Sequence, residues 1–165
     1  MRLTLWIQTA FLFAVGIFIT FSQIHNAIIG NLGLMFVALG YATAATIEVL
    51  KTKQSGKPNG SPTLQVLIFG AIATAAIVFA ASNNIISFLV LVISFAVFNG
   101  LLELKKVSVQ KESKLSAFIH FGLVAVLAIS GALTGLDPVA FVGFFGAYAV
   151  ILAVHLGITA ATPKA

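Results

Sequence analysis

The chain has no cysteine among its 165 residues, and only 8% of its residues are charged. Without cysteine, a disulfide framework, a thiolate nucleophile and a metal site with thiolate ligands are all excluded. Acidic groups are especially scarce, because four Asp and Glu residues stand against nine Lys and Arg. So few charges cannot coat the surface of a water-soluble domain of this length.

Motifs for catalysis are missing as well. The sequence contains no phosphate-binding loop, no dinucleotide fingerprint and no nucleophile motif, and its glycines stand inside apolar stretches. Ser87, Ser94 and Ser130 have no candidate base nearby in the sequence, and the three histidines do not follow a metal-binding spacing such as H-x-x-x-H. We therefore expect a protein that is not an enzyme and that holds no metal and no cofactor.

Apolar residues make up 60% of the chain, and the mean hydropathy is +1.12. A helix needs about 20 apolar residues to cross the hydrocarbon core of a membrane. Six apolar runs of that kind follow one another at 3–21, 27–49, 64–81, 85–104, 115–133 and 139–160. The sequence thus predicts an all-α fold, a polytopic bundle of six transmembrane helices that forms a single domain over residues 1–165. We expect the first run to be retained, since the residues after it show no signal-peptide cleavage pattern.

The links between the runs alternate in length. Three of the links, at residues 22–26, 82–84 and 134–138, are very short. The helices on either side of each short link must therefore be antiparallel neighbours, which predicts three helical hairpins. In the last of these links, Asp137 and Pro138 are typical of a helix start. Residues 50–63 and 105–114 form longer links that are rich in Lys, Ser, Gly and Gln.

The basic residues indicate how the chain is oriented. All nine either precede the first run or follow the second, fourth and sixth runs: Arg2, Lys51, Lys53, Lys57, Lys105, Lys106, Lys111, Lys114 and Lys164. Because basic residues favour the cytoplasmic side, both termini are predicted to be cytoplasmic. These residues adjoin span ends and do not form a stripe with interleaved aromatics, so we expect anionic lipid headgroups as their partners and no nucleic acid.

The second helices of the three hairpins can be aligned without gaps. Glu48, Glu103 and His155 each stand seven residues after an equivalent position, at Tyr41, Ala96 and Tyr148. The recurrence of an ionisable residue at one place in every hairpin is consistent with a threefold internal repeat.

Ionisable and amide side chains inside spans are costly, so they are the candidates for function. The candidate polar pathway consists of Glu48, Asn99, Glu103, His120 and His155. A second interpretation is structural, with each Glu reaching the headgroups in an i,i+3 ion pair to Lys51 or Lys106. Asn99 and Asn31 would then join helices through hydrogen bonds, and the deep His120 would need a buried partner.

Small residues also recur four apart within the spans. The candidate helix-packing pairs are Ala38 with Ala42, Gly131 with Gly135, and Gly143 with Ala147. Such stripes let helix backbones approach closely in lipid. Pairs on the outer face would serve association with a second copy or with another membrane protein.

Four segments of the chain also carry a resemblance to a known family. They are the closing stretch Gly143-Phe-Phe-Gly-Ala-Tyr-Ala-Val-Ile-Leu-Ala-Val-His-Leu-Gly-Ile-Thr-Ala160, the Asp137-Pro138 turn, Phe21-Ser22-Gln23-x-His25 and Phe98-x-Gly100-Leu-Leu-Glu103. Together they resemble the HdeD-like group of small six-helix membrane proteins, in particular its short actinobacterial members. The resemblance implies a place in the bacterial inner membrane and an association with acid resistance, with no catalytic residues to transfer. The chain departs from the group by having no Pro in its first two short links.

Two functions follow from these observations. The first is a non-enzymatic protein of the HdeD-like kind that acts through helix packing or association with membrane partners, in envelope or acid stress. The second is a small transporter or channel for protons or another solute, with a polar pathway among the second helices of the hairpins. The two differ in whether the polar faces of those helices converge on a cavity or point separately at headgroups.

Overall fold

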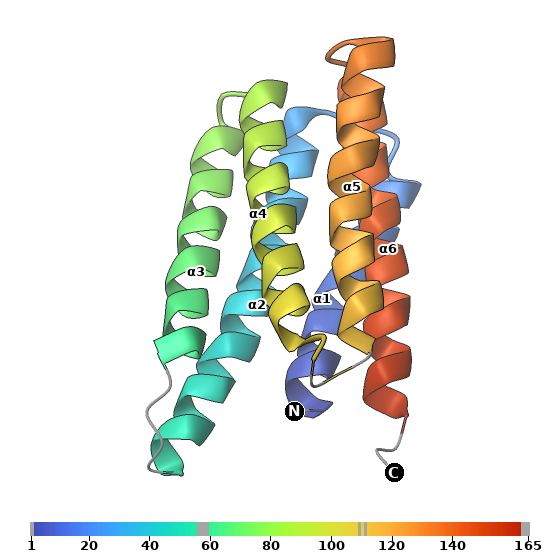
Figure 1. Ribbon diagram of the computed structural model, residues 1–165. Helices are drawn as coiled ribbons and strands as arrows, with labels where there is room; N and C mark the ends of the chain where they lie inside the picture. The colour runs from blue at the N-terminus through green and yellow to red at the C-terminus, as the bar shows by residue number, and fades with distance from the viewer. Residues whose placement is uncertain (1, 56–59, 109, 111, 163–165) are drawn as a thin grey trace.

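Six α-helices and no strands make up the described part of the chain in the computed structural model (Figure 1). The structure describes residues 2–55, 60–108, 110 and 112–162. The helices are α1 (Arg2–Phe21), α2 (Ala27–Gln54), α3 (Gly60–Ala80), α4 (Ile85–Lys106), α5 (Glu112–Thr134) and α6 (Pro138–Ala161). Each is long and apolar enough to cross a membrane. The predicted all-helical fold, with six helices of a length and composition that suit a membrane span, is confirmed.

The helices extend into both longer links. α2 runs on to Gln54 and α3 begins at Gly60, so much of the predicted link 50–63 is helical, and residues 56–59 lie outside the described part. Lys51 and Lys53 lie in the last turn of α2, where a positive charge interacts favourably with the negative end of the helix dipole. Glu112 lies in the first turn of α5, where a negative charge interacts favourably with the positive end of the helix dipole. Helix formation therefore continues beyond the apolar stretch that sequence reading detects.

The three short turns share one construction. Asn26, Asn84 and Asp137 are the N-caps of α2, α4 and α6, and each accepts a hydrogen bond through its Oδ1 from a backbone N–H two or three residues later. Pro138 occupies the start of α6, as predicted. Gly135, just beyond the end of α5, has a φ of 70°, a left-handed conformation that glycine adopts without a steric penalty. Each turn thus stops one helix and starts its antiparallel neighbour (Figure 1).

The second helices of the three pairs occupy the centre of the bundle. α2, α4 and α6 all contact one another, whereas α1, α3 and α5 each lie between two of them. Burial follows the same division: 56%, 39% and 50% of the apolar window is buried in α2, α4 and α6, against 28% in each of the other three. Peripheral helices with large apolar side chains exposed outward are what a lipid surrounding requires.

The most extensive helix contacts lie between pairs. α3 packs most closely on α2, and α1 packs most closely on α6. At the α1–α6 crossing, a Cβ atom placed on Gly16 would lie 2.8 Å from the backbone nitrogen of Val150, and one on Gly146 would lie 2.6 Å from Cγ2 of Ile19. Glycine at these positions is what allows the two backbones to approach so closely.

The two ends of the bundle differ. The terminal end carries the described parts of both chain termini and of the two longer links, and the turn end carries the three short turns (Figure 1). The half near the turn end is filled mainly with apolar side chains, and the buried polar residues Asn31 and Ser130 lie among them. Ile19, Leu34, Phe88 and Phe145 are 0% exposed there. Polar side chains gather in the other half.

Candidate functional site

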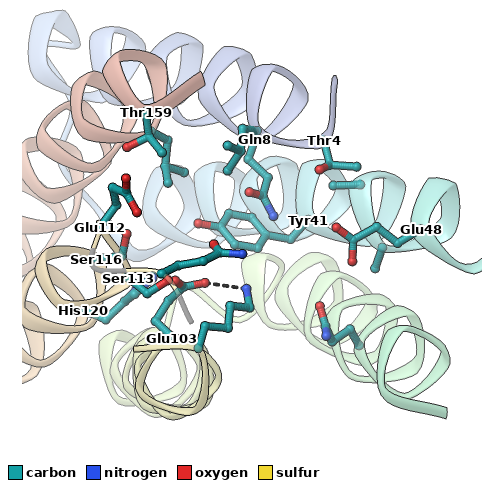
Figure 2. Close-up of a pocket in the computed structure, with 17 residues that line it drawn as sticks. Thr4, Gln8, Tyr41, Glu48, Glu103, Glu112, Ser113, Ser116, His120 and Thr159 are labelled. Atoms are coloured by element: carbon teal, nitrogen blue, oxygen red, sulfur yellow. Dashed lines mark hydrogen bonds and ion pairs between the residues drawn. The ribbon is translucent and has the colours of Figure 1, made fainter. Parts of the chain in front are cut away.

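A partly enclosed polar cavity of about 80 Å³ lies near the terminal end. Such a volume has room for a small cluster of waters or for one small solute. All six helices and the link between α4 and α5 contribute to its wall (Figure 2): Thr4, Leu5, Gln8, Tyr41, Ala44, Ala45, Glu48, Gln65, Glu103, Lys106, Gln110, Glu112, Ser113, Ser116, His120, Leu156 and Thr159.

Three of the four acidic residues of the chain line this one cavity. Glu103 forms an ion pair with Lys106, with 2.6 Å between Oε1 and Nζ. Glu48 and Glu112 have no ion-pair partner within the described residues. The cavity therefore keeps two carboxylates whose charge no described side chain neutralises, in a protein whose net charge is +5.

The expected ion pairs at the helix ends are confirmed only in part. Glu103 and Lys106 do pair through their i,i+3 spacing, but Glu48 and Lys51 do not. Glu48 is half-buried and its carboxylate points toward the cavity (Figure 2). Lys51 is exposed. The prediction for Glu48 was wrong because the side chain turns inward, away from the headgroup side of the helix.

Tyr41 lies deep in the cavity and is only 5% exposed. Its ring packs against Phe69 and Phe95, with centroids 5.2 Å away in both cases. Its hydroxyl points into the cavity (Figure 2) and makes no hydrogen bond with any described residue. Because the hydroxyl borders the open space of the cavity, it is available to whatever occupies that space.

His120 lines the cavity from α5 and is 2% exposed. Its Nδ1 lies 2.7 Å from the hydroxyl oxygen of Tyr148 on α6. The sequence-based expectation that this histidine needs a buried partner is therefore confirmed. Since Nδ1 is engaged by Tyr148, Nε2 is the ring nitrogen left for a bound group.

His155 does not line the cavity. Its Nε2 lies 2.9 Å from Oγ of Ser116, and it is Ser116 that faces the cavity. His155 is a member of the predicted polar pathway, but its ring turns toward α5 and contacts Ser116 on the side away from the cavity. Two of the three aligned ionisable residues, Glu48 and Glu103, thus meet at the cavity, and the third lies one side chain away.

The two buried asparagines do not join helices as expected. Asn99 donates a hydrogen bond from Nδ2 to the carbonyl oxygen of Phe95 in its own helix, at 2.9 Å, and it lies outside the cavity wall. Asn31 is 0% exposed, and neither its Nδ2 nor its Oδ1 has a partner within the described residues. For Asn99 the carbonyl four residues earlier is always within reach, so a bond inside the helix competes with one across helices.

The small-residue pairs have different surroundings. Ala38 is buried and Ala42 half-buried on α2, which fits close packing inside the bundle. Gly131 stands beside the ring of Phe141, but Gly135 belongs to the turn and lies outside any helix, so these two do not form a stripe. A Cβ on Gly143 would meet no atom within 4 Å, and Ala147 is exposed, so this pair faces outward on α6.

Tyr41 and Glu112 are site residues that sequence reasoning missed. Tyr41 lies two helical turns before Glu48 on the same face of α2, and the repeat alignment already placed it level with Tyr148. Its position on the same helix face as Glu48, together with its alignment with Tyr148, was the feature of the sequence that could have identified it. Glu112 stood in a predicted link, where an acidic residue carries no information about which way it faces.

Six helices capable of spanning a membrane, arranged around a polar cavity, define a multi-pass membrane protein. The chain matches no protein-family model, no curated protein and no solved structure in comparisons with known proteins. Its function must therefore be argued from the cavity itself.

Proposed function

We propose that this protein is a small carrier of a bacterial plasma membrane that binds a polar solute in the cavity at its terminal end. The observation that carries this proposal is the convergence of polar side chains from six helices on one partly enclosed space. Each such side chain is expensive to place in a membrane protein, and such groups usually mark a solute or ion pathway. Polar side chains that converge on one cavity favour the transport function over the interpretation in which each side chain separately contacts lipid headgroups.

The terminal end is assigned to the cytoplasm. The basic residues that the structure describes belong to that end of the bundle: Arg2, Lys51, Lys53, Lys105, Lys106 and Lys114. The positive-inside bias supports this orientation. Both termini and the mouth of the cavity would then face the cell interior.

A carrier fits this arrangement better than an open channel. Beyond Tyr41, large side chains such as Phe88, Phe141 and Phe145 are at most 1% exposed and fill the bundle toward the turn end. A solute could leave on that side only if the helices moved apart. The arrangement of three similar hairpins around α2, α4 and α6 supports a threefold repeat, and movement of one repeat against the others is a common basis of alternating access.

A second candidate function is the non-enzymatic one suggested by the resemblance to the HdeD-like group. Its specific support is the outward-facing pair Gly143 and Ala147 on α6, which would allow a close helix contact with a second copy or a membrane partner. A role in envelope or acid stress belongs to this candidate. It requires no solute in the cavity, and this separates the two proposals.

The absence of cysteine makes a direct test possible. We would replace Thr159, which lines the cavity, with cysteine, and use Ser108, an exposed residue outside the cavity wall, as the matched control. Each variant is reconstituted in liposomes and treated with N-ethylmaleimide. Swelling is then followed by light scattering in glycerol, urea, alanine, potassium chloride and methylammonium chloride.

The carrier proposal predicts that at least one solute enters faster than into protein-free liposomes. It also predicts that labelling slows this entry in T159C and leaves S108C unchanged. Entry of no solute by correctly folded protein, or equal rates before and after labelling of T159C, would overturn the proposal in favour of the packing role.

A further inference from the structure

We infer that the transported solute is a small uncharged molecule that both donates and accepts hydrogen bonds, and that Asn31 is its contact in the turn-end half of the bundle. This inference rests on the proposed carrier function and names the substrate class. Asn31, near the start of α2, is 0% exposed, and neither its Nδ2 nor its Oδ1 has a partner within the described residues.

A buried amide without partners is unfavourable in any conformation that keeps it dry. Its two N–H donors and its carbonyl oxygen have lost water and gained no protein group in exchange. The chain around it is closely packed, since a Cβ on Gly30 would lie 2.9 Å from both Cε2 of Phe88 and Cγ2 of Val142. A conformation in which the turn-end half opens would give the amide of Asn31 the partners that it lacks here.

Asn31 lies on a face of α2 that leads to the cavity. Asn31, Ala38 and Ala45 follow one another at seven-residue spacing, which keeps them on nearly the same side of the helix. Ala45 lines the cavity, and Ala38 is 0% exposed. Between the amide and the cavity, this line of α2 carries the small side chain of Ala38. The step from Asn31 to Ala45 corresponds to about 21 Å of rise, so the amide lies well beyond the cavity, in the closed half of the bundle.

The surroundings in this half determine the charge of a solute that can cross it. Among the described residues, the buried polar side chains of the turn-end half are those of Asn31 and Ser130, and both are neutral. An ion that entered would lose its hydration with no opposite charge to replace it, which costs far more than for a neutral molecule. A neutral molecule with a donor and an acceptor matches the amide, which has both.

The carboxylates at the cavity are compatible with an uncharged solute. Glu112 is exposed and Glu48 is half-buried, so water screens their charges. A carboxylate also accepts hydrogen bonds from neutral O–H and N–H donors. A solute with hydroxyl or amide groups would therefore find acceptors at the cavity and an amide in the other half.

The first test compares the entry of solutes into liposomes that contain the full-length protein, followed by light scattering. Urea and glycerol are the uncharged probes, potassium chloride and methylammonium chloride are the ionic ones, and alanine is a zwitterion. We expect urea or glycerol to enter faster than into protein-free liposomes, and the other three to enter at the protein-free rate. N31L should slow the faster of the two uncharged solutes by about tenfold, the factor that corresponds to the loss of one hydrogen bond.

N99L is the matched control. Asn99 is also a buried amide, but it donates a hydrogen bond to Phe95 in its own helix and lies outside the cavity wall. Liposomes with N99L should admit the same solute at the unaltered rate. Thermal unfolding in detergent then separates a transport contact from a structural one. N31L removes an amide that has no partner in the described chain, so its unfolding temperature should equal or exceed that of the unaltered protein.

A cysteine at position 31 tests whether water reaches this part of the bundle. The thiolate is the form that reacts with N-ethylmaleimide, so a thiol in a dry apolar core is protected. A76C is the control, since Ala76 is 0% exposed and lies, like Asn31, four residues from the turn end of its helix. N31C in liposomes should react faster than A76C. If N31L does not fold, as judged by size-exclusion chromatography, this comparison decides the question.

Four results would each overturn the inference: entry of potassium chloride, methylammonium chloride or alanine through the protein, unaltered entry of urea and glycerol with folded N31L, a lower unfolding temperature for N31L, or reaction of N31C as slow as that of A76C. Its failure can be separated from failure of the carrier proposal. Entry of an ion that is blocked by labelling at T159C would reject the uncharged solute and retain the carrier. No entry of any solute with folded protein would reject both.

Discussion

The hydroxyl oxygen of Tyr148 lies 2.7 Å from Nδ1 of His120 and thereby connects α6 to α5 inside the bundle. Tyr41, at the equivalent position of the first hairpin, is equally buried but has no such partner in the described chain. The two tyrosines thus occupy matching places and have different roles. One hydroxyl holds two helices together, and the other faces the cavity.

This difference predicts unequal effects of removing each hydroxyl. Y148F leaves Nδ1 of the buried His120 without its partner, so it should lower the free energy of unfolding by about 1–3 kcal/mol. Y41F removes a group that has no partner and should change it by less than about 0.5 kcal/mol. Thermal unfolding of the two variants in the same detergent measures the difference. Equal unfolding temperatures would show that the Tyr148–His120 contact does not stabilise the bundle.

A second prediction concerns the crossing of α1 and α6. In G16A the new methyl group would lie 2.7 Å from Cγ2 of Val150 and 2.8 Å from its backbone nitrogen, so the helices must separate. The expected loss of stability is about 1–3 kcal/mol. Gly122, in the middle of α5, is the control, since a Cβ there meets no atom within 4 Å. G122A should be neutral or more stable by up to about 1 kcal/mol. Matching unfolding temperatures for G16A and G122A would contradict the close approach.

A third prediction concerns the start of α6. Oδ1 of Asp137 accepts a hydrogen bond from the backbone N–H of Val139 at 3.0 Å. D137A should destabilise the protein by about 0.5–2 kcal/mol, while D137N, which preserves the cap, should not. Denaturation of both variants in detergent, followed by circular dichroism, checks this. A loss of stability in D137N as large as that in D137A would mean that charge, and not capping, is what matters at this turn.

A fourth prediction tests the orientation in the membrane. Ser82 is exposed at the turn end, and Ser55 is exposed at the terminal end just after α2. In spheroplasts, a membrane-impermeant maleimide should label S82C directly, and should label S55C only after the membrane is permeabilised. The native chain has no cysteine to contribute background. Labelling in the reverse order would place the cavity mouth on the external side.

The spans could be predicted because a membrane imposes a simple requirement on composition. Long apolar runs and short turns such as that at Asp137 can be read locally, and the described helices follow them closely. The extra length of α2 could not be read in this way. Hydropathy falls after Val49, but the backbone hydrogen bonds that make a helix do not depend on lipid and continue through Lys51 and Lys53.

The site was predictable only at residues whose ionisable side chains are unfavourable in or near a membrane span. Glu48, Glu103 and His120 stood out as ionisable groups near or within spans, and all three line the cavity. The position of His155 behind Ser116 depends on how α5 and α6 face each other, and sequence spacing does not encode this. The same is true of Glu112, which joins the wall only because α5 begins earlier than its apolar stretch.

The contact between α1 and α6 has a consequence for biogenesis. α1 is synthesised before the other five helices of the bundle, but α6, the helix on which it packs most closely, is synthesised after them. Until α6 is inserted into the membrane, the surface of α1 around Gly16 contacts only lipid acyl chains, and the ring of helices is incomplete on that side. Insertion of α6 is therefore a closing step for the six-helix bundle, and a nascent chain that stops before Pro138 would present the membrane quality-control machinery with an α1 surface that has no partner helix.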